Sequence, residues 1–106
     1  MSKQMIIKVT EAGALPLLSE VPKLDLRTMQ SLVGGLIQPV QLEPGITLWC
    51  DEEAKLKGIP LNRHVEDVWG NVWDINGPFF LCGDNEEGDA FGLTVVQATK
   101  WLALLQ

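Results

Sequence analysis

The chain has 106 residues, of which 46 % are hydrophobic and 21 % are charged, and its net charge at pH 7 is −6. This composition predicts one folded domain over residues 1–106 and excludes a disordered chain, and the lack of an apolar run of about 20 residues excludes a membrane-spanning helix. The negative charge argues against direct binding of duplex nucleic acid, which depends on many lysine and arginine contacts to phosphate.

The N-terminal residues lack the apolar core of a secretory signal, and we therefore expect a cytoplasmic protein. Two segments with strand patterns follow. Residues 4–10 alternate between apolar and polar side chains, which predicts a first strand. Residues 15–21 predict a short partner strand, and Pro16 favours a place at the edge of a sheet because proline cannot donate a backbone hydrogen bond.

A helix and a hairpin follow. Asp25 is suited to cap a helix over residues 26–35, which a glycine pair ends. The segments 36–42 and 46–50 flank a short turn that contains proline and glycine, which predicts a β-hairpin. Pro39 indicates that the first of these strands is an edge strand or contains a bulge.

A second hairpin is predicted over residues 66–75, with Gly70-Asn71 as a two-residue turn. This register places three pairs of residues opposite each other: Trp69 and Val72, Val68 and Trp73, and Asp67 and Asp74.

The C-terminal part contains a buried strand over residues 77–83, an acidic loop over residues 84–89 and a helix over residues 95–105. Thr94 and Gln97 form a capping box at the start of this helix. Its candidate core residues are Trp101, Leu102 and Leu105. We therefore expect an α+β fold with a mainly antiparallel sheet and two helices packed on one face.

No arrangement typical of catalysis is present. Cys50 and Cys82 lie far apart, His64 is the only histidine, and no nucleophile, phosphate-loop or dinucleotide motif occurs. The acidic loop departs from the spacing of an EF-hand, and the few Cys and His residues argue against a zinc site. We expect two buried, reduced cysteines and no enzymatic activity, metal or cofactor.

The basic stretch, residues 50–64, is the most distinctive segment. Lys55, Lys57 and Arg63 fall within nine residues of a chain that has eight lysines and arginines in total. Asn62 places an amide beside the Arg63 guanidinium. Together they can bind a phosphate through the guanidinium and form hydrogen bonds with the polar edge of a base or ribose through the amide, and the nearby proline stiffens the backbone.

The same residues also permit a purely structural interpretation. The two lysines can pair at the surface with the acids at 51–53, each pair contributing about 0–1 kcal/mol. Asn62 would then cap a turn, and Arg63 would pair with Glu66 or Asp67.

The four tryptophans are candidates for stacking against a nucleobase. Trp49 and Trp69 lie near the basic stretch in sequence and are the better candidates, whereas core packing is favoured for Trp73 and Trp101.

Three segments carry a resemblance that spans nearly the whole chain: LVGGLIQPVQL (32–42), CDEEAKLKGIPLNR (50–63) and GPFFLCG (77–83) with the acidic loop and terminal helix after it. With these, the chain resembles a small uncharacterised domain family carried mostly by phages, plasmids and other bacterial mobile elements. The resemblance implies no reaction and no catalytic residue. It implies a context in which small proteins often modulate host machinery or counter host defence.

The leading hypothesis is a non-enzymatic protein that captures a small phosphate-bearing ligand, such as a cyclic or modified nucleotide, as an anti-defence sponge. Its ligand-binding residues would be Lys55, Lys57 and Arg63 for phosphate, Asn62 for a polar edge, and Trp49 or Trp69 for stacking.

The alternative is an acidic interaction protein that uses residues 51–53 and 84–89 to block a host enzyme or nucleic-acid-binding protein. A small hydrolase based on Asp and Glu is a third hypothesis. For the leading hypothesis, an exposed edge strand offers a route to a homo-oligomer, whose interface could complete the pocket.

Overall fold

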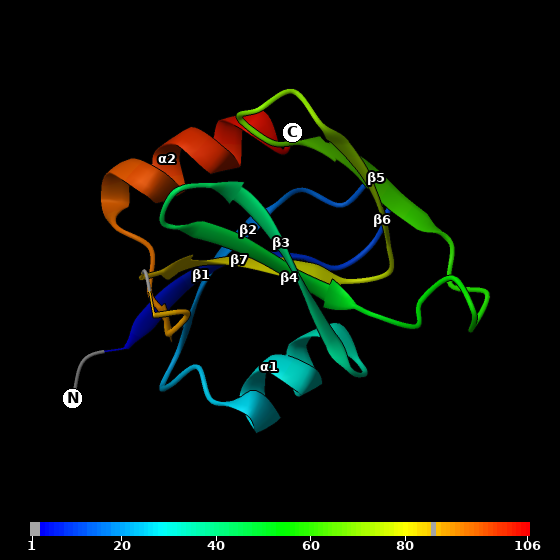
Figure 1. Cartoon of the computed structure of the whole chain (residues 1–106), viewed down its shortest axis with the longest axis horizontal. Coiled ribbons are helices and arrows are strands. Elements are labelled where there is room, and N and C mark those ends of the chain that lie inside the picture. The colour runs from blue at the N-terminus through cyan, green and yellow to red at the C-terminus, as the bar shows by residue number, and fades with distance from the viewer. Residues whose placement is uncertain (1–2, 86) are drawn as a thin grey trace.

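The computed structural model describes residues 3–85 and 87–106, which form eight strands and two helices. The elements are β1 (Gln4–Val9), β2 (Leu17–Val21), α1 (Leu26–Val33), β3 (Ile37–Glu43), β4 (Ile46–Asp51), β5 (Leu61–Glu66), β6 (Val72–Asn76), β7 (Phe79–Asp84), β8 (Ala90–Phe91) and α2 (Val95–Leu104). A six-stranded sheet has the order β2–β1–β7–β4–β3, with β8 paired to the end of β7 (Figure 1). Strands β5 and β6 pair only with each other and form a separate ribbon.

The first half of the chain folds as predicted. Strand β2 pairs antiparallel with β1 and lies at one edge of the sheet, and β3, which contains Pro39, lies at the other. The Asp25 carboxylate accepts a hydrogen bond of 2.9 Å from the amide of Thr28 and so caps α1. Met29 and Val33 of α1 are buried. The β3–β4 hairpin contains a bulge near its turn, between Gln41 and Glu43, rather than at Pro39.

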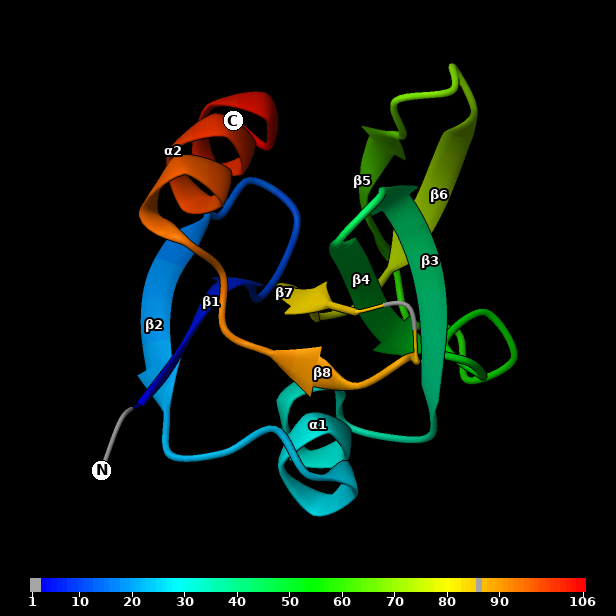
Figure 2. The same ribbon diagram turned by 60° about the vertical axis from the view of Figure 1, so that its left-hand side comes forward.

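The sheet is buried on both faces, and this arrangement corrects the expected position of the helices. In the central strand β7, Phe79 and Leu81 join a core cluster with Trp101 of α2, whereas Phe80 and Cys82 join a second cluster beneath α1. Successive side chains of a strand point to opposite faces, so the two clusters lie on opposite sides of the sheet. The α+β fold with a mainly antiparallel sheet is confirmed, but α1 covers one face while α2 and the β5–β6 ribbon cover the other (Figure 2).

The register of the β5–β6 ribbon differs from the predicted one. Val72 lies opposite Glu66 rather than Trp69, and Asp74 lies opposite His64 rather than Asp67. The connection is consequently a five-residue loop over 67–71, and β5 begins at Leu61, inside the basic stretch.

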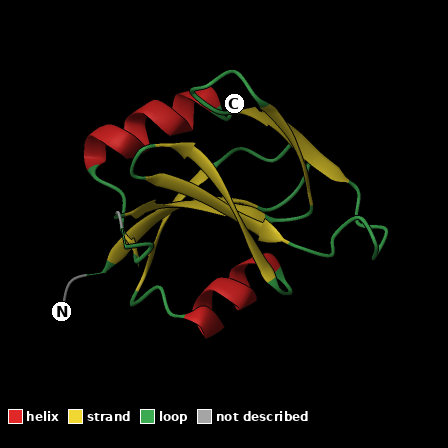
Figure 3. Ribbon diagram, viewed as in Figure 1, coloured by secondary structure: helices red, strands yellow, loops and turns green. Residues whose placement is uncertain are grey.

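Helix α2 begins with the predicted capping box. The Gln97 amide donates to Thr94 Oγ1 at 3.1 Å, and the Thr94 amide donates to Gln97 Oε1 at 2.9 Å. Trp101 and Leu105 are buried in the core and Leu102 packs partly against it, as expected. Figure 3 shows α1 and α2 on either side of the strands. Within the described ranges, neither helix has the length and apolarity needed to cross a bilayer.

Candidate functional site

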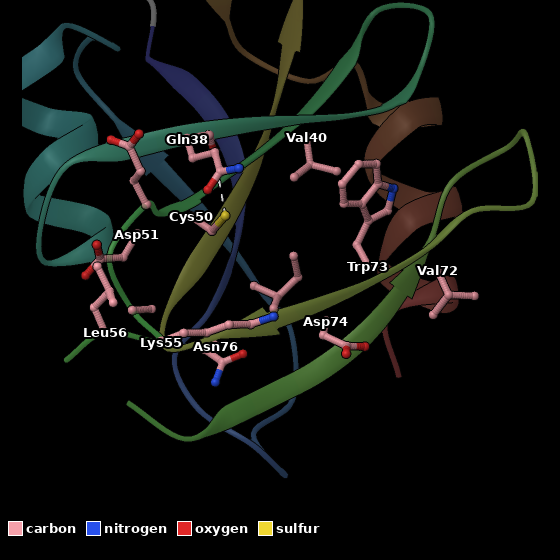
Figure 4. A pocket seen from close by; sticks show the side chains of 13 residues that line it. Gln38, Val40, Cys50, Asp51, Lys55, Leu56, Val72, Trp73, Asp74 and Asn76 are labelled. Carbon is pink, nitrogen blue, oxygen red and sulfur yellow. Dashed lines mark hydrogen bonds between the residues drawn. The ribbon is translucent and has the colours of Figure 1, made fainter. Parts of the chain in front are cut away.

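A cavity of about 350 Å³ lies between the β3–β4 hairpin and β6. Buried Val40, Cys50 and Ile75 contribute its apolar wall, because strands β3, β4 and β6 each turn an inward-facing side chain towards it. In Figure 4, Trp73 rises from β6 towards Val40 at one end of the cavity, and Lys55 extends into it from the loop after β4. The cavity therefore combines an apolar wall, an aromatic ring and an ammonium group.

The loop over residues 67–71, between β5 and β6, fixes the orientation of the Trp73 ring. Trp73 Nε1 donates a hydrogen bond of 3.0 Å to Oδ2 of Asp67, a buried carboxylate. The same carboxylate accepts bonds from the Asn71 side chain and from the amides of Trp69 and Asn71 at 2.9–3.0 Å. Burial raises the pKa of Asp67, but these hydrogen bonds outweigh it and lower the pKa to about 2. Trp73 stays 39 % exposed and presents a positioned indole to the cavity.

The loop that carries Lys55 is one helical turn closed by Gly58. The Gly58 amide donates to Lys55 O at 3.1 Å and the Ile59 amide to Ala54 O at 3.0 Å, which is the paired bonding of a Schellman motif. Gly58 has φ +72°, a conformation that side chains disfavour. Lys55 makes no ion pair within the described residues, so its ammonium is available to a ligand.

Lys57, by contrast, is part of the structure of the loop. Its Nζ lies 2.6 Å from Oδ2 of Asp51, whose side chain is fully buried. Burial raises the pKa of Asp51, but the hydrogen bonds from Lys57 and the Glu53 amide hold the pKa below its usual range. A Cβ added to Gly35 would lie 2.7 Å from Lys57 Nζ and 2.9 Å from Asp51 Oδ2, so a glycine is needed for this close approach.

Asn62 and Arg63 hold the start of β5 against other elements. Asn62 is buried and donates to Gly77 O at 2.9 Å and Val9 O at 3.3 Å. The Arg63 guanidinium donates to Ala14 O at 2.6 Å and to Leu105 O at the end of α2. Its Nε donates to Asn62 Oδ1 at 3.2 Å. The arginine therefore binds backbone carbonyls, and neither predicted partner, Glu66 or Asp67, contacts it among the described ion pairs.

The two tryptophans chosen from sequence lie away from Lys55. Trp49 packs against the core cluster beneath α1. Trp69 lies in the loop of the β5–β6 ribbon, is 58 % exposed, and lines a different, shallow cavity with Pro44, Asp84 and Asn85. Of the six predicted ligand-binding residues, only Lys55 lines the cavity between β3–β4 and β6.

Sequence reasoning assigned Trp73 to core packing and did not single out Gln38, Asp74 or Asn76, although all four line this cavity. Strand alternation was the available signal, because it places Trp73 on the same face of β6 as the buried Ile75, which also lines the cavity. Asp74 lies on the rim, where its Oδ1 is 2.6 Å from Nδ1 of His64.

The described residues contain no activated thiol and no metal-binding cluster. Burial, with a contribution from Asp51, raises the pKa of the Cys50 thiol to about 11, and burial raises that of Cys82 to about 12. Both cysteines are free and buried, as predicted. No group of three or more His, Cys, Asp or Glu side chains in the described part of the chain is arranged to hold a metal ion. Glu86 of the acidic loop lies outside the described residues.

Comparison with known protein families matches residues 4–106 to one family, described as a domain of unknown function. No curated protein and no solved structure matches the chain. The family match covers nearly the whole sequence and agrees with the predicted resemblance to an uncharacterised domain. The chain therefore belongs to the DUF3846 family of domains of unknown function.

Proposed function

We propose that this protein is a non-enzymatic binding protein that captures a small phosphate-bearing ligand, such as a cyclic or modified nucleotide, in the cavity between β3–β4 and β6. The observation that carries the proposal is the pairing of an available ammonium with a positioned indole: Lys55 and Trp73 line the same cavity. An indole stacks on a heteroaromatic ring, and an ammonium attracts a phosphate.

The other two basic residues of the stretch, Lys57 and Arg63, have structural roles. Lys57 neutralises the buried Asp51, and Arg63 with Asn62 joins β5 to the end of α2 and to the β1–β2 turn. These residues position the loop and the ribbon that border the cavity and need not touch the ligand. The three cationic residues grouped in sequence therefore divide into one ligand-binding residue and two structural ones.

We further propose that the protein serves a phage or another mobile element by withholding a nucleotide signal from its host. The support is the sequence resemblance to domains carried by such elements, together with a cavity whose lining thiol, that of Cys50, is held protonated at neutral pH by a pKa raised to about 11. Binding without turnover would make the protein a sponge. Self-association through the free edge of β2 remains a prediction of the same proposal.

Isothermal titration calorimetry with a panel of cyclic mononucleotides, cyclic dinucleotides and cyclic ADP-ribose variants tests the capture proposal. We expect saturable binding of at least one compound at micromolar concentration or tighter, with Lys55→Gln weakening it about 10-fold or more. Lys3→Gln removes the same charge from an exposed residue that does not line the cavity, and it should leave binding unchanged. Lack of heat across the panel, or equal loss in both variants, would contradict the proposal.

One observation favours the alternative of an acidic interaction protein. The exposed Trp69 shares a shallow cavity with Asp84 and Asn85, at the start of the acidic loop. An exposed tryptophan beside negative charge is suited to anchor a basic partner protein. Affinity capture from host lysate, compared between the natural chain and Trp69→Ser, tests this. A single partner retained only by the natural chain and released by moderate salt would support it, and identical recovery by both chains would exclude it.

A further inference from the structure

The charges that border the cavity restrict its ligand. Lys55 supplies one positive charge, while the carboxylates of Glu52 and Asp74 supply two negative charges. Asp51 also lines the cavity, but its charge is paired with Lys57 at 2.6 Å. A ligand with several phosphates would meet one favourable ammonium and two repelling carboxylates. The balance therefore favours a ligand with a single negative charge, placed at Lys55.

The hydrogen-bonding groups restrict the ligand in a second, independent way. Asn76 Nδ2 donates to Ile59 O at 2.9 Å, and Asn76 Oδ1 accepts no hydrogen bond from the described residues, so the amide offers the cavity an acceptor oxygen. Figure 4 shows the Asn76 nitrogen turned away from the cavity and its oxygen on the side of Lys55. Asp74 uses Oδ1 on His64 and offers its second oxygen as a further acceptor. Among the described residues that line the cavity, Lys55 and the exposed amide of Gln38 offer side-chain donors.

Size provides a third restriction. A cavity of about 350 Å³ lies near the lower end of small-molecule sites, which span about 300–1,000 Å³. One indole, that of Trp73, lines it. It therefore offers space and a stacking surface for one heteroaromatic ring rather than two.

We infer that the cavity takes a single heteroaromatic ring that carries an amino group and one negative charge, the chemistry of a cyclic aminopurine or aminopyrimidine mononucleotide. The ring stacks on Trp73, its amino group donates to Asn76 Oδ1, and its phosphodiester contacts Lys55. The inference rests on the proposed function and narrows it, because it excludes nucleoside triphosphates and cyclic dinucleotides as preferred ligands.

Calorimetric titration with four compounds tests the inference: 3′,5′-cyclic AMP, 3′,5′-cyclic IMP, ATP and cyclic di-AMP. Cyclic IMP differs from cyclic AMP by a carbonyl in place of the amino group, so it places an acceptor against the Asn76 and Asp74 oxygens. We expect it to bind about 10- to 100-fold more weakly, because one hydrogen bond is lost and an acceptor pair is created. ATP and cyclic di-AMP should bind at least about 10-fold more weakly than cyclic AMP.

The outcomes separate the two levels of the proposal. Cyclic di-AMP or ATP binding more tightly than cyclic AMP, with loss of binding in Lys55→Gln, would overturn the inference and leave phosphate-ligand capture intact. Equal affinity for cyclic AMP and cyclic IMP would overturn the amino-group recognition. Absence of binding by all four compounds, and by the wider nucleotide panel, would overturn the proposed function itself. Circular dichroism of Lys55→Gln confirms that the variant is folded, so that a loss of binding reports on the cavity.

Discussion

Lys55 and Lys57 lie two residues apart on the same helical turn, and replacing each with methionine separates a structural lysine from a ligand-binding one. Methionine keeps most of the length of the side chain and removes its charge and its hydrogen-bond donors. Lys57→Met leaves Asp51, whose side chain is fully buried, without the ammonium that lies 2.6 Å from it. Lys55→Met breaks no ion pair or hydrogen bond among the described residues.

The structure sets the expected size of this difference. Removing one partner of a buried ion pair costs about 3–5 kcal/mol. Lys57 is 40 % exposed, so water screens the pair, and Asp51 keeps its bond of 2.9 Å from the Glu53 amide. We therefore expect Lys57→Met to lower the free energy of unfolding by about 1–3 kcal/mol at pH 7, and Lys55→Met to change it by less than about 0.5 kcal/mol.

Urea unfolding followed by tryptophan fluorescence measures both variants. With an m-value of about 1–2 kcal/mol/M, the midpoint of Lys57→Met should fall by about 0.5–3 M. The folded pKa of Asp51 is lowered, so the stability from its pair is present above its unfolded pKa of about 4 and is lost as pH falls further. The difference between the natural chain and Lys57→Met should consequently shrink below about pH 4. Equal midpoints for the two variants at pH 7 would refute the structural assignment of Lys57.

Three further outcomes are expected. Arg63→Met should lower the free energy of unfolding by about 2–4 kcal/mol in urea titrations, because it removes bonds to the carbonyls of two other segments; an unchanged midpoint would show that these bonds do not hold the ribbon. The pKa of Asp67 is about 2 when folded and about 4 when unfolded, so its contribution to stability is lost as pH falls from about 4 to about 2. Thermal unfolding across this window should decline less steeply for Asp67→Asn, and parallel curves would contradict this assignment. Cys50 and Cys82, with pKa values of about 11 and 12, should react with a thiol reagent at pH 8 only after denaturant is added, and rapid native-state labelling would contradict their burial.

Local chemistry made much of the fold predictable. Short-range sequence patterns predicted the caps of both helices, the β3–β4 hairpin and the first two strands, and the structure contains all of them. The position of the two helices on opposite faces of the sheet could also have been predicted, from the unbroken apolar run of β7. Residues Phe79, Phe80, Leu81 and Cys82 are all buried, and a strand buried on both faces needs cover on both sides of its sheet.

The second hairpin shows where local chemistry was overruled. Gly70-Asn71 is a favourable two-residue turn, yet Asp67 accepts bonds from the amides of residues 69 and 71 and organises a five-residue loop instead. The Val68 amide also donates to Leu42 O at 2.8 Å, a contact with β3 that no turn rule contains. Together these bonds give a register that differs from the predicted one, and the Asp67 carboxylate holds the Trp73 indole beside the cavity.

The candidate site was predicted only in part, because contacts between segments that are distant in sequence decide where its side chains lie. Lys55, Lys57 and Arg63 are close in sequence, but the turn closed by Gly58 and the strand after it send their side chains to three different environments. Their closeness in sequence identifies the segment that borders the cavity. Which of the two lysines lines the cavity depends on how that segment packs against β6.

The central claim is that ligand capture takes place between β3–β4 and β6. The most direct measurement is a ¹⁵N–¹H NMR titration of the full chain with 3′,5′-cyclic AMP. The account predicts saturable shifts of the Trp73 indole N–H and of the amides of Gln38 and Asn76, with little change at Asn62 and Arg63. Shifts that cluster at Asn62 and Arg63, or no saturable shift at the cavity, would contradict it.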